Sequence, residues 1–487
     1  MDAIALQVVT GALRAACEEM GGVLVRAAHS SNIKERRDCS TALFDERGEM
    51  VMQAEHIPVH LGAMPAAVAA VLGERHEPGV SWVLNDPYAG GTHLPDITVI
   101  TPAFAQGALL GFAASRAHHA DVGGRLPGSM PADSRTLEEE GVVISPRVLD
   151  DAAVDELADR MRQPAERRAD LRAQLAANRV GVRRLEAFEP EVLREAFAAV
   201  LDYAERRTRA CLAALPDGER TARDLLEAAD GDLALGVTAI VAGDELTLRF
   251  DAPPQHDGNL NCPLAVTRSA AYFAVRVLTD PDIPPSAGAY RPVRVEAPEG
   301  SLLNARPPAA VVAGNVETSS RVADLVLRAF GRALGQGTMN NLTLGNEAFT
   351  YYETLGGGQG ACPDAAGPSG VHVAMSNTLN TPVEALEQTF PLRVTRYELR
   401  RGSGGDGLHA GGDGVVREVE ALEDMTWSLL TERRRHPPAG AEGGADGARG
   451  RNVVAGEDVA PKATGTLRAG ERLRLETPGG GGHGTAA

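Results

Sequence analysis

The sequence predicts a mixed α+β protein that has more than one domain. Its 487 residues exceed what a single hydrophobic core usually organises. Residues 150–214 are rich in Ala, Leu, Glu and Arg, as helices are, whereas the chain from residue 339 onward is glycine-rich and β-like. Two apolar runs, at 97–104 and 109–114, flank a short glycine-containing connection and indicate a β-hairpin.

Changes in composition divide the chain into four regions. Helical composition begins after residue 149 and ends at the turn Pro216-Asp217-Gly218. The predicted regions are the N-terminal helix with the hairpin at 1–149, a helical segment at 150–218, a mixed α/β region at 219–338, and a Gly-rich, β-like C-terminal region at 339–487.

Local patterns predict the elements of the first region. Apolar residues recur at helical spacing after Asp2, so Asp2 is placed to cap a helix that runs to about Ala28. Residues 39–44 are typical of a strand, and a helix is expected from about Gly62 to Glu74. The acidic stretch that starts at Glu138 is predicted to lead into a strand at 142–144.

Similar patterns continue through the second and third regions. Pro164 and Pro190 interrupt the helical segment. Two further helices are predicted, at about 265–278 and, with a capped start, at 315–334. A turn at Gly243-Asp244 lies between two predicted strands.

Charge and cysteine usage exclude several classes of protein. A net charge of -18 and a pI near 5.2 argue against a nucleic-acid partner, which would require a basic face. The five cysteines form no CxxC pair, so neither a disulfide framework nor a thiolate zinc site is indicated. No apolar stretch has transmembrane length and no leader is recognisable, so we expect a cytoplasmic protein without a membrane partner.

The glycine runs do not form a nucleotide-binding motif. A phosphate-binding loop of the Walker type requires a lysine after its last glycine, and no lysine lies near the run at 356–360. We therefore expect these glycines to serve turns and close approach of the chain.

Histidines and carboxylates flank the predicted hairpin in the sequence, and the hairpin brings them to the same end. His93 and Asp96 form an H-x-x-D pair before the first run, and His118 follows the second. Imidazole and carboxylate groups that converge from loops and strand ends are suited to a divalent metal ion. The region 1–149 is therefore predicted to hold a metal site.

The turn predicts the register of the hairpin. If Gln106-Gly107 is the two-residue turn, Ala105 faces Ala108. Asp96 then falls opposite Ala117, beside His118.

Neighbouring residues have competing interpretations. Adjacent strand residues point to opposite faces, so only one of His118 and His119 is expected to bind metal. Asp121 shares a face with His119 and suits the orientation of an imidazole, or else ordinary turn chemistry. Glu140 is either a general base or part of a solvated acidic turn.

Other polar residues have ordinary explanations. Asp38, beside Arg36 and Arg37, is explained by a cap or a salt bridge. Structural hydrogen bonding is favoured for His56 and His60.

A series of motifs resembles the hydantoinase B/oxoprolinase family, the B-type subunits of ATP-dependent lactam and cyclic-amide hydrolases. The motifs include Asn85-Asp-Pro-Tyr-Ala-Gly-Gly-Thr-His-Leu-Pro-Asp96 and His118-His-Ala-Asp-Val-Gly-Gly124. The others lie in order at 31–38, 55–62, 139–144, 314–319, 351–361, 380–384 and 478–482.

This resemblance implies that Asp38 joins His93, Asp96 and His118 as a metal ligand. It also implies zinc, as in the lactamase-like members, or manganese, as in the related acetone carboxylases. An A-type partner subunit would bind ATP and Mg and phosphorylate the substrate, in a heterotetramer or a larger assembly.

The function so implied is ring opening of a small cyclic amide, either 5-oxoproline, a hydantoin or another lactam. Metal-bound water would attack the phosphorylated intermediate, with Glu140 or Asp121 as the catalytic group that moves the proton. The alternatives are a subunit of an ATP-dependent carboxylase, a non-catalytic scaffold, and a hydrolase that acts without ATP or a partner.

Overall fold

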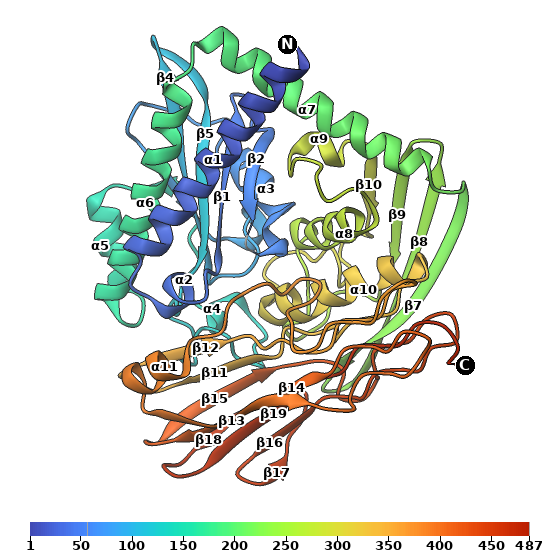
Figure 1. The fold of residues 1–487 in the computed structure, drawn as a ribbon. Coiled ribbons are helices and arrows are strands. Elements are labelled where there is room, and N and C mark those ends of the chain that lie inside the picture. Colours follow the sequence, from blue (N-terminus) through green and yellow to red (C-terminus); the bar gives the residue numbers. More distant parts are fainter. Residues whose placement is uncertain (56, 487) are drawn as a thin grey trace.

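The computed structural model describes residues 1–55 and 57–486 and has the mixed helical and sheet composition that the sequence predicts. Helices and one large sheet from the first half of the chain lie above a layer of C-terminal strands (Figure 1). None of the described helices combines the length and apolar character that a membrane span requires. The four-region division stays a prediction.

The first sheet has the strand order β2-β1-β5-β4-β3-β6, and all of its pairs are antiparallel. Its strands are β1 Cys39–Asp45, β2 Met50–Glu55, β3 Trp82–Leu84, β4 Asp96–Ala105, β5 Ala108–His118 and β6 Arg147–Val148. Helix α1 (Ala3–Ala27), capped by Asp2, packs with α6 (Pro164–Glu186) on one face, and α3 (Ala63–Ala69) covers the other. Because both faces are buried, charged groups within this sheet are shielded from water.

The hairpin of β4 and β5 confirms the predicted turn but not the predicted register. Ala105 pairs with Ala108 around Gln106-Gly107, and both turn residues have positive φ. The register then shifts between Ala103 and Phe104, because Leu110 is an extra residue in β5. The prediction that Asp96 lies opposite Ala117 is therefore wrong, and Asp96 pairs directly with His118.

The helical segment consists of α5 (Asp151–Asp159), α6 and α7 (Pro190–Ala213). Pro164 and Pro190 are the first residues of α6 and α7, where a missing N–H costs no helical hydrogen bond. The predicted strand at 142–144 is wrong. The acidic stretch forms the short helix α4 (Leu137–Glu140), and residues 142–144 are irregular.

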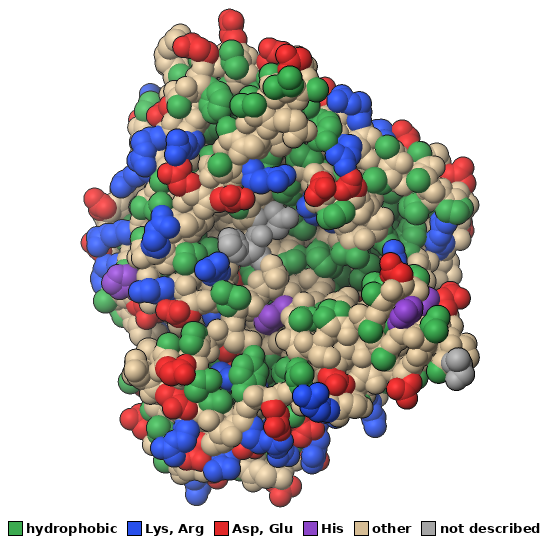
Figure 2. Space-filling view, in the orientation of Figure 1, with side chains coloured by type: hydrophobic (Ala, Val, Ile, Leu, Met, Phe, Trp, Pro, Cys, Tyr) green, Lys and Arg blue, Asp and Glu red, His purple; other side chains and the backbone are tan. Residues whose placement is uncertain are grey.

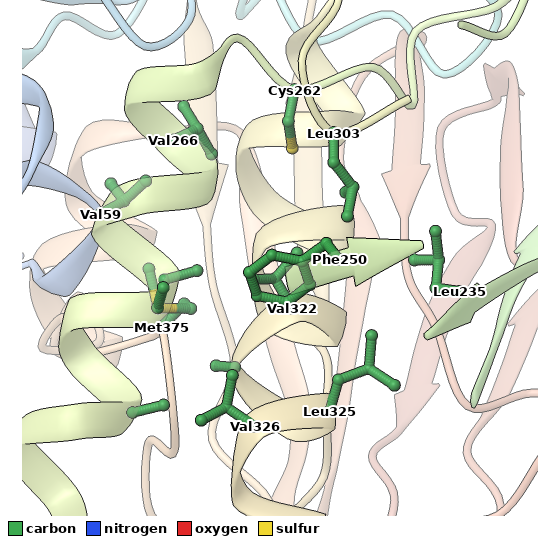
Figure 3. Close-up of a cluster of buried hydrophobic side chains, with 14 of the residues drawn as sticks. Val59, Leu235, Phe250, Cys262, Val266, Leu303, Val322, Leu325, Val326 and Met375 are labelled. Atoms are coloured by element: carbon green, nitrogen blue, oxygen red, sulfur yellow. The ribbon is translucent and has the colours of Figure 1, made fainter. Parts of the chain in front are cut away.

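A second sheet, ordered β10-β9-β8-β7, packs against two helices. Its elements are β7 Gly218–Ala228, β8 Gly231–Ala242, β9 Glu245–Asp251, α8 Leu264–Leu278, β10 Val293–Glu296 and α10 Ser319–Ala329. The helix predicted at 315–334 has no capped start, because a π-helical turn (Gly314–Thr318) runs directly into α10. Figure 3 shows the core between these elements, with Val59 and Met375 beside α8.

Two further sheets form the C-terminal layer and enclose one hydrophobic core between them. One has the order β12-β11-β15-β18 and the other β13-β14-β19-β16-β17. Their elements are β11 Asn341–Gly345, β12 Thr350–Glu353, α11 Val383–Thr389, β13 Leu392–Arg400, β14 Gly414–Ala421, β15 Met425–Leu430, β16 Arg451–Val454, β17 Glu457–Asp458, β18 Lys462–Leu467 and β19 Arg472–Glu476.

The glycine runs bring backbones together, as predicted. The amide of Gly412 donates to the carbonyl of Gln359 at 2.9 Å, and Gly480 donates to Gly412 at 2.9 Å. A Cβ atom on Gly480 would lie 2.0 Å from the Gln359 carbonyl oxygen, so no side chain fits there. These glycines therefore hold chain segments against one another.

Candidate metal centre

Asp96, His93 and His118 converge at one end of the hairpin. Asp96 begins β4, His118 ends β5 directly opposite, and His93 lies in the loop before β4. Asp96 Oδ1 is 3.3 Å from His93 Nε2 and 3.3 Å from His118 Nδ1. One potential ligand atom from each residue lies within 4.8 Å of the others, and all three residues are buried.

The unpaired atoms of this group fit a divalent cation. Both ring nitrogens of His93 and Nε2 of His118 are buried without a hydrogen-bond partner. Buried polar atoms normally have a partner, so these nitrogens are available to a ligand. Two imidazoles and a carboxylate form a donor set that zinc or manganese accepts.

The bulge in β5 produces this arrangement. Directly paired residues of antiparallel strands project their side chains to the same face, whereas a shift by one residue turns them to opposite faces. Without Leu110 as the extra residue, His118 would point away from Asp96. Gly111, which follows it, has φ +151° and lies against the Phe44 carbonyl of β1.

Asp38 lies on the wall of the same cavity as His93, Asp96 and His118. It enters β1 beside the end of β5, and its carbonyl accepts a hydrogen bond from the His118 amide at 3.0 Å. The salt bridge suggested by the sequence is long, because Arg36 Nη2 is 3.9 Å from Asp38 Oδ2. Burial raises the pKa of Asp38, while His118 and Arg36 partly offset this effect.

The electrostatics of Asp96 favour its ionised form. Burial alone would raise its pKa, but His93, His118 and His60 outweigh that effect and hold the pKa well below its usual range. Burial lowers the pKa of His118 despite the two nearby carboxylates. An ionised carboxylate beside a neutral His118 imidazole is the protonation state that metal binding requires.

His60 is a member of this centre that sequence patterns did not identify. Its Nδ1 lies 2.8 Å from Ser40 Oγ, so the predicted structural hydrogen bond is confirmed. Its Nε2, however, lies 3.4 Å from Asp96 Oδ2. Thr92 Oγ1 also donates to Asp96 Oδ2, at 2.5 Å. His56 falls outside the described residues.

Tyr352 approaches the centre from β12 in the C-terminal layer. Its ring stacks on the His118 imidazole with centroids 4.6 Å apart and an interplanar angle of 8°. Its hydroxyl donates to Asn341 Oδ1 at 2.6 Å, and the Arg36 guanidinium carbon lies 4.6 Å from its ring centroid. These contacts hold the His118 ring in place from a distant part of the chain.

Glu140 and Asp121 do not line this cavity. The Glu140 carboxylate accepts hydrogen bonds from Ser134 Oγ at 2.9 Å and from the amides of Val311 and Val312, and burial raises its pKa to about 7. Asp121 accepts from backbone amides and from Arg162, while His119 Nε2 lies 3.0 Å from Gln174 Oε1. The role of Glu140 or Asp121 in proton transfer stays a prediction.

The cavity between these side chains has about 20 Å³ of space. One water molecule needs about 10–15 Å³ by this measure, so the cavity suits an ion or a single water. Apolar side chains, including Val59, Val316 and Met375, complete its wall. The histidines and carboxylates are themselves at most 6% exposed, so little of their surface meets bulk water.

The family model described as Hydantoinase B/oxoprolinase matches residues 2–486. The chain belongs to this family. It is 40% identical to 5-oxoprolinase 1 of Arabidopsis thaliana over 99% of its own length but only 42% of that protein. It is 30% identical to a Pseudomonas protein named as a candidate B-type subunit of a D-/L-hydantoinase, covering 99% of this chain and 90% of that one.

Solved structures of the same fold include an ATP-dependent caprolactamase from Pseudomonas jessenii. That structure has a TM-score of 0.93 and 29% sequence identity, over 100% of this chain and 91% of that one. A nucleotide-free acetone carboxylase has a TM-score of 0.88 over 99% of this chain and 75% of that one, and at 16% identity it shows the shared fold alone. This member of the hydantoinase B/oxoprolinase family therefore spans about two fifths of the plant 5-oxoprolinase but most of the caprolactamase chain.

Proposed function

We propose that this chain is the metal-bearing hydrolytic subunit of an ATP-dependent cyclic-amide hydrolase. The observation that carries the proposal is the buried group of Asp96, His93 and His118, in which both ring nitrogens of His93 and Nε2 of His118 have no hydrogen-bond partner. The names of the relatives, 5-oxoprolinase and caprolactamase, support a cyclic amide as the substrate. The substrate class is then 5-oxoproline, a hydantoin or another lactam.

We assign the metal to His93, Asp96, His118 and Asp38. The first three offer ligand atoms within 4.8 Å of one another, and Asp38 lines the same cavity. A zinc or manganese ion would supply a Lewis acid, which lowers the pKa of bound water from about 15.7 to about 7. Tyr352 would fix the His118 ring, and the burial of the four ligand residues limits their contact with other water.

We assign ATP, with its Mg, to an A-type partner subunit. An amide resists water because its nitrogen donates electrons into the carbonyl. Phosphorylation of the carbonyl oxygen removes that resonance and creates a leaving group. This chain has no Walker lysine beside its glycine runs. At Gly412 and Gly480, other backbone segments occupy the space beside the glycine. The Pseudomonas relative is named as one subunit of a hydantoinase, which supports a heteromeric complex, proposed to be a heterotetramer or larger.

The test is reconstitution of this chain with an A-type partner chain. The complex should open 5-oxoproline, a hydantoin or ε-caprolactam only with ATP, and His93→Ala should abolish ring opening while phosphorylation by the partner continues. Unchanged turnover in His93→Ala would overturn the proposal in favour of a scaffold. Activity of this chain without ATP or partner, or transfer of label from bicarbonate into an acid product, would indicate the alternative enzymes.

A further inference from the structure

A second, larger cavity adjoins the metal cavity. It has about 520 Å³ of space, and Ser376 and Asn377 line both cavities. In the neighbouring segment, Ile57 and Val59 line the metal cavity, whereas Pro58 lines the larger one. The two spaces are therefore separated by single chain segments, and we call the larger one the outer cavity.

The metal cavity is too small for the ring of a cyclic amide, whereas the outer cavity is large enough. Small-molecule sites usually measure about 300–1,000 Å³ and combine apolar walls with a few polar groups. The outer cavity has this character, with Phe273 and Val277 of α8 and Leu327 of α10 among its apolar residues. Figure 2 draws one face of the molecule and shows a hollow near its middle, with hydrophobic side chains along the hollow.

His372 provides a polar group at the boundary of the two cavities. It lines the outer cavity, and its Nδ1 lies 2.5 Å from the hydroxyl of Ser376, which lines both. Its Nε2 is buried without a hydrogen-bond partner. Burial lowers the pKa of His372 to about 4, so the ring is neutral at pH 7. Nε2 is then a donor or an acceptor, according to the tautomer, and a cyclic amide offers the complement to either.

We propose that the outer cavity holds the ring of the cyclic amide, which reaches this chain as the phosphorylated intermediate, beside the metal centre, with its apolar ring atoms against Phe273, Val277 and Leu327 and its ring nitrogen at His372 Nε2. The inference rests on the proposed function and adds the position of the substrate to it. Ser376 lines both the outer cavity and the metal cavity, so a ring bound in the outer cavity lies next to the metal centre. The size of ring accepted is set by the distance between α8 and α10.

The chain offers a closely matched pair of variants. Val277 is 48% exposed, so Val277→Trp extends into the outer cavity without displacing the protein core. Val192, on α7, is also 48% exposed and lines neither cavity, which makes Val192→Trp the control. His372→Phe keeps a ring of similar shape and removes both nitrogens.

The experiment measures binding of ε-caprolactam and 5-oxoproline to this chain alone by ligand-observed NMR, without ATP. We expect wild type to bind at least one probe, Val277→Trp and His372→Phe to weaken that binding by about tenfold or more, and Val192→Trp to leave it unchanged. Metal content should be equal in all four proteins. Equal binding by wild type and Val277→Trp, or no binding of either probe to wild type, would overturn the inference.

This outcome is separable from failure of the proposed function. Binding is measured without turnover, so a reconstituted complex that fails to open the ring does not change the NMR result. Conversely, ring opening with unchanged kinetics in Val277→Trp would preserve the proposed function and place the substrate elsewhere.

Discussion

Replacement of Gly111 by alanine tests whether the β5 bulge builds the metal centre. At this residue φ is +151°, and a Cβ atom would lie 2.1 Å from the carbonyl oxygen of Phe44. Strained backbone costs about 1–3 kcal/mol for a residue with a side chain. Overpacking against a fixed neighbour adds about 1–3 kcal/mol. We therefore expect Gly111→Ala to lower the free energy of unfolding by about 2–6 kcal/mol.

The change should also remove metal binding. The strain is relieved if the bulge is lost, and β5 then pairs in the register in which Asp96 faces Ala117 and His118 turns to the other side. Gly107→Ala is the matched control in the same hairpin. Gly107 has φ +81°, but no atom lies within 4 Å of the Cβ position, so only the backbone cost of about 1 kcal/mol applies.

Urea unfolding and metal analysis of the two purified variants decide the question. Gly107→Ala should retain the metal content of wild type and most of its stability. Gly111→Ala should lose several times more stability and bind less metal. Equal stability and equal metal content in the two variants would refute the role assigned to the bulge.

Three further substitutions probe the surroundings of the centre. Glu140→Gln should lower the free energy of unfolding by about 1–3 kcal/mol, because the buried carboxylate accepts hydrogen bonds from Ser134 and two backbone amides. A hundredfold loss of kcat at unchanged stability would instead support a role of Glu140 in proton transfer. Tyr352→Phe removes the hydroxyl bonded to Asn341 and should weaken metal affinity about tenfold by calorimetry, and an unchanged Kd would contradict its positioning role. Burial raises the pKa of Glu317 from 4.5 to about 8, so the folded protein retains a proton that the unfolded chain releases. The stabilisation present below pH 4.5 is then lost as the pH rises toward 8, by up to about 1.4 kcal/mol per pH unit. Glu317→Gln should flatten this slope in urea titrations at pH 5.5 and 8, and identical slopes would disprove the assignment.

The hairpin shows how far sequence patterns reach. The turn at Gln106-Gly107 was predictable because a short glycine-containing connection separates two apolar runs. The predicted register was wrong because a bulge, unlike a turn, depends on contacts with a neighbouring strand, here the contact between Gly111 and β1. A lone glycine within an apolar strand is a known indicator of a bulge, and Gly111 was the available sign.

Long-range contacts explain the rest of the difference. His93 and Asp96 are close in sequence, so their pairing was predictable, and the hairpin added His118. Tyr352 reaches His118 only through packing of the C-terminal layer against the first sheet, which no local pattern encodes. A structural hydrogen bond, now seen with Ser40, was a sufficient explanation for His60, so its second contact, with Asp96, was not predicted.

The most direct test of the central claim is a structure of the purified chain by anomalous X-ray diffraction, combined with elemental analysis. We predict one zinc or manganese ion per chain, bonded to the side chains of Asp38, His93, Asp96 and His118, and its loss in His93→Ala. A wild-type chain that binds no divalent metal at this position, or a His93→Ala variant that retains the full complement, would contradict the claim.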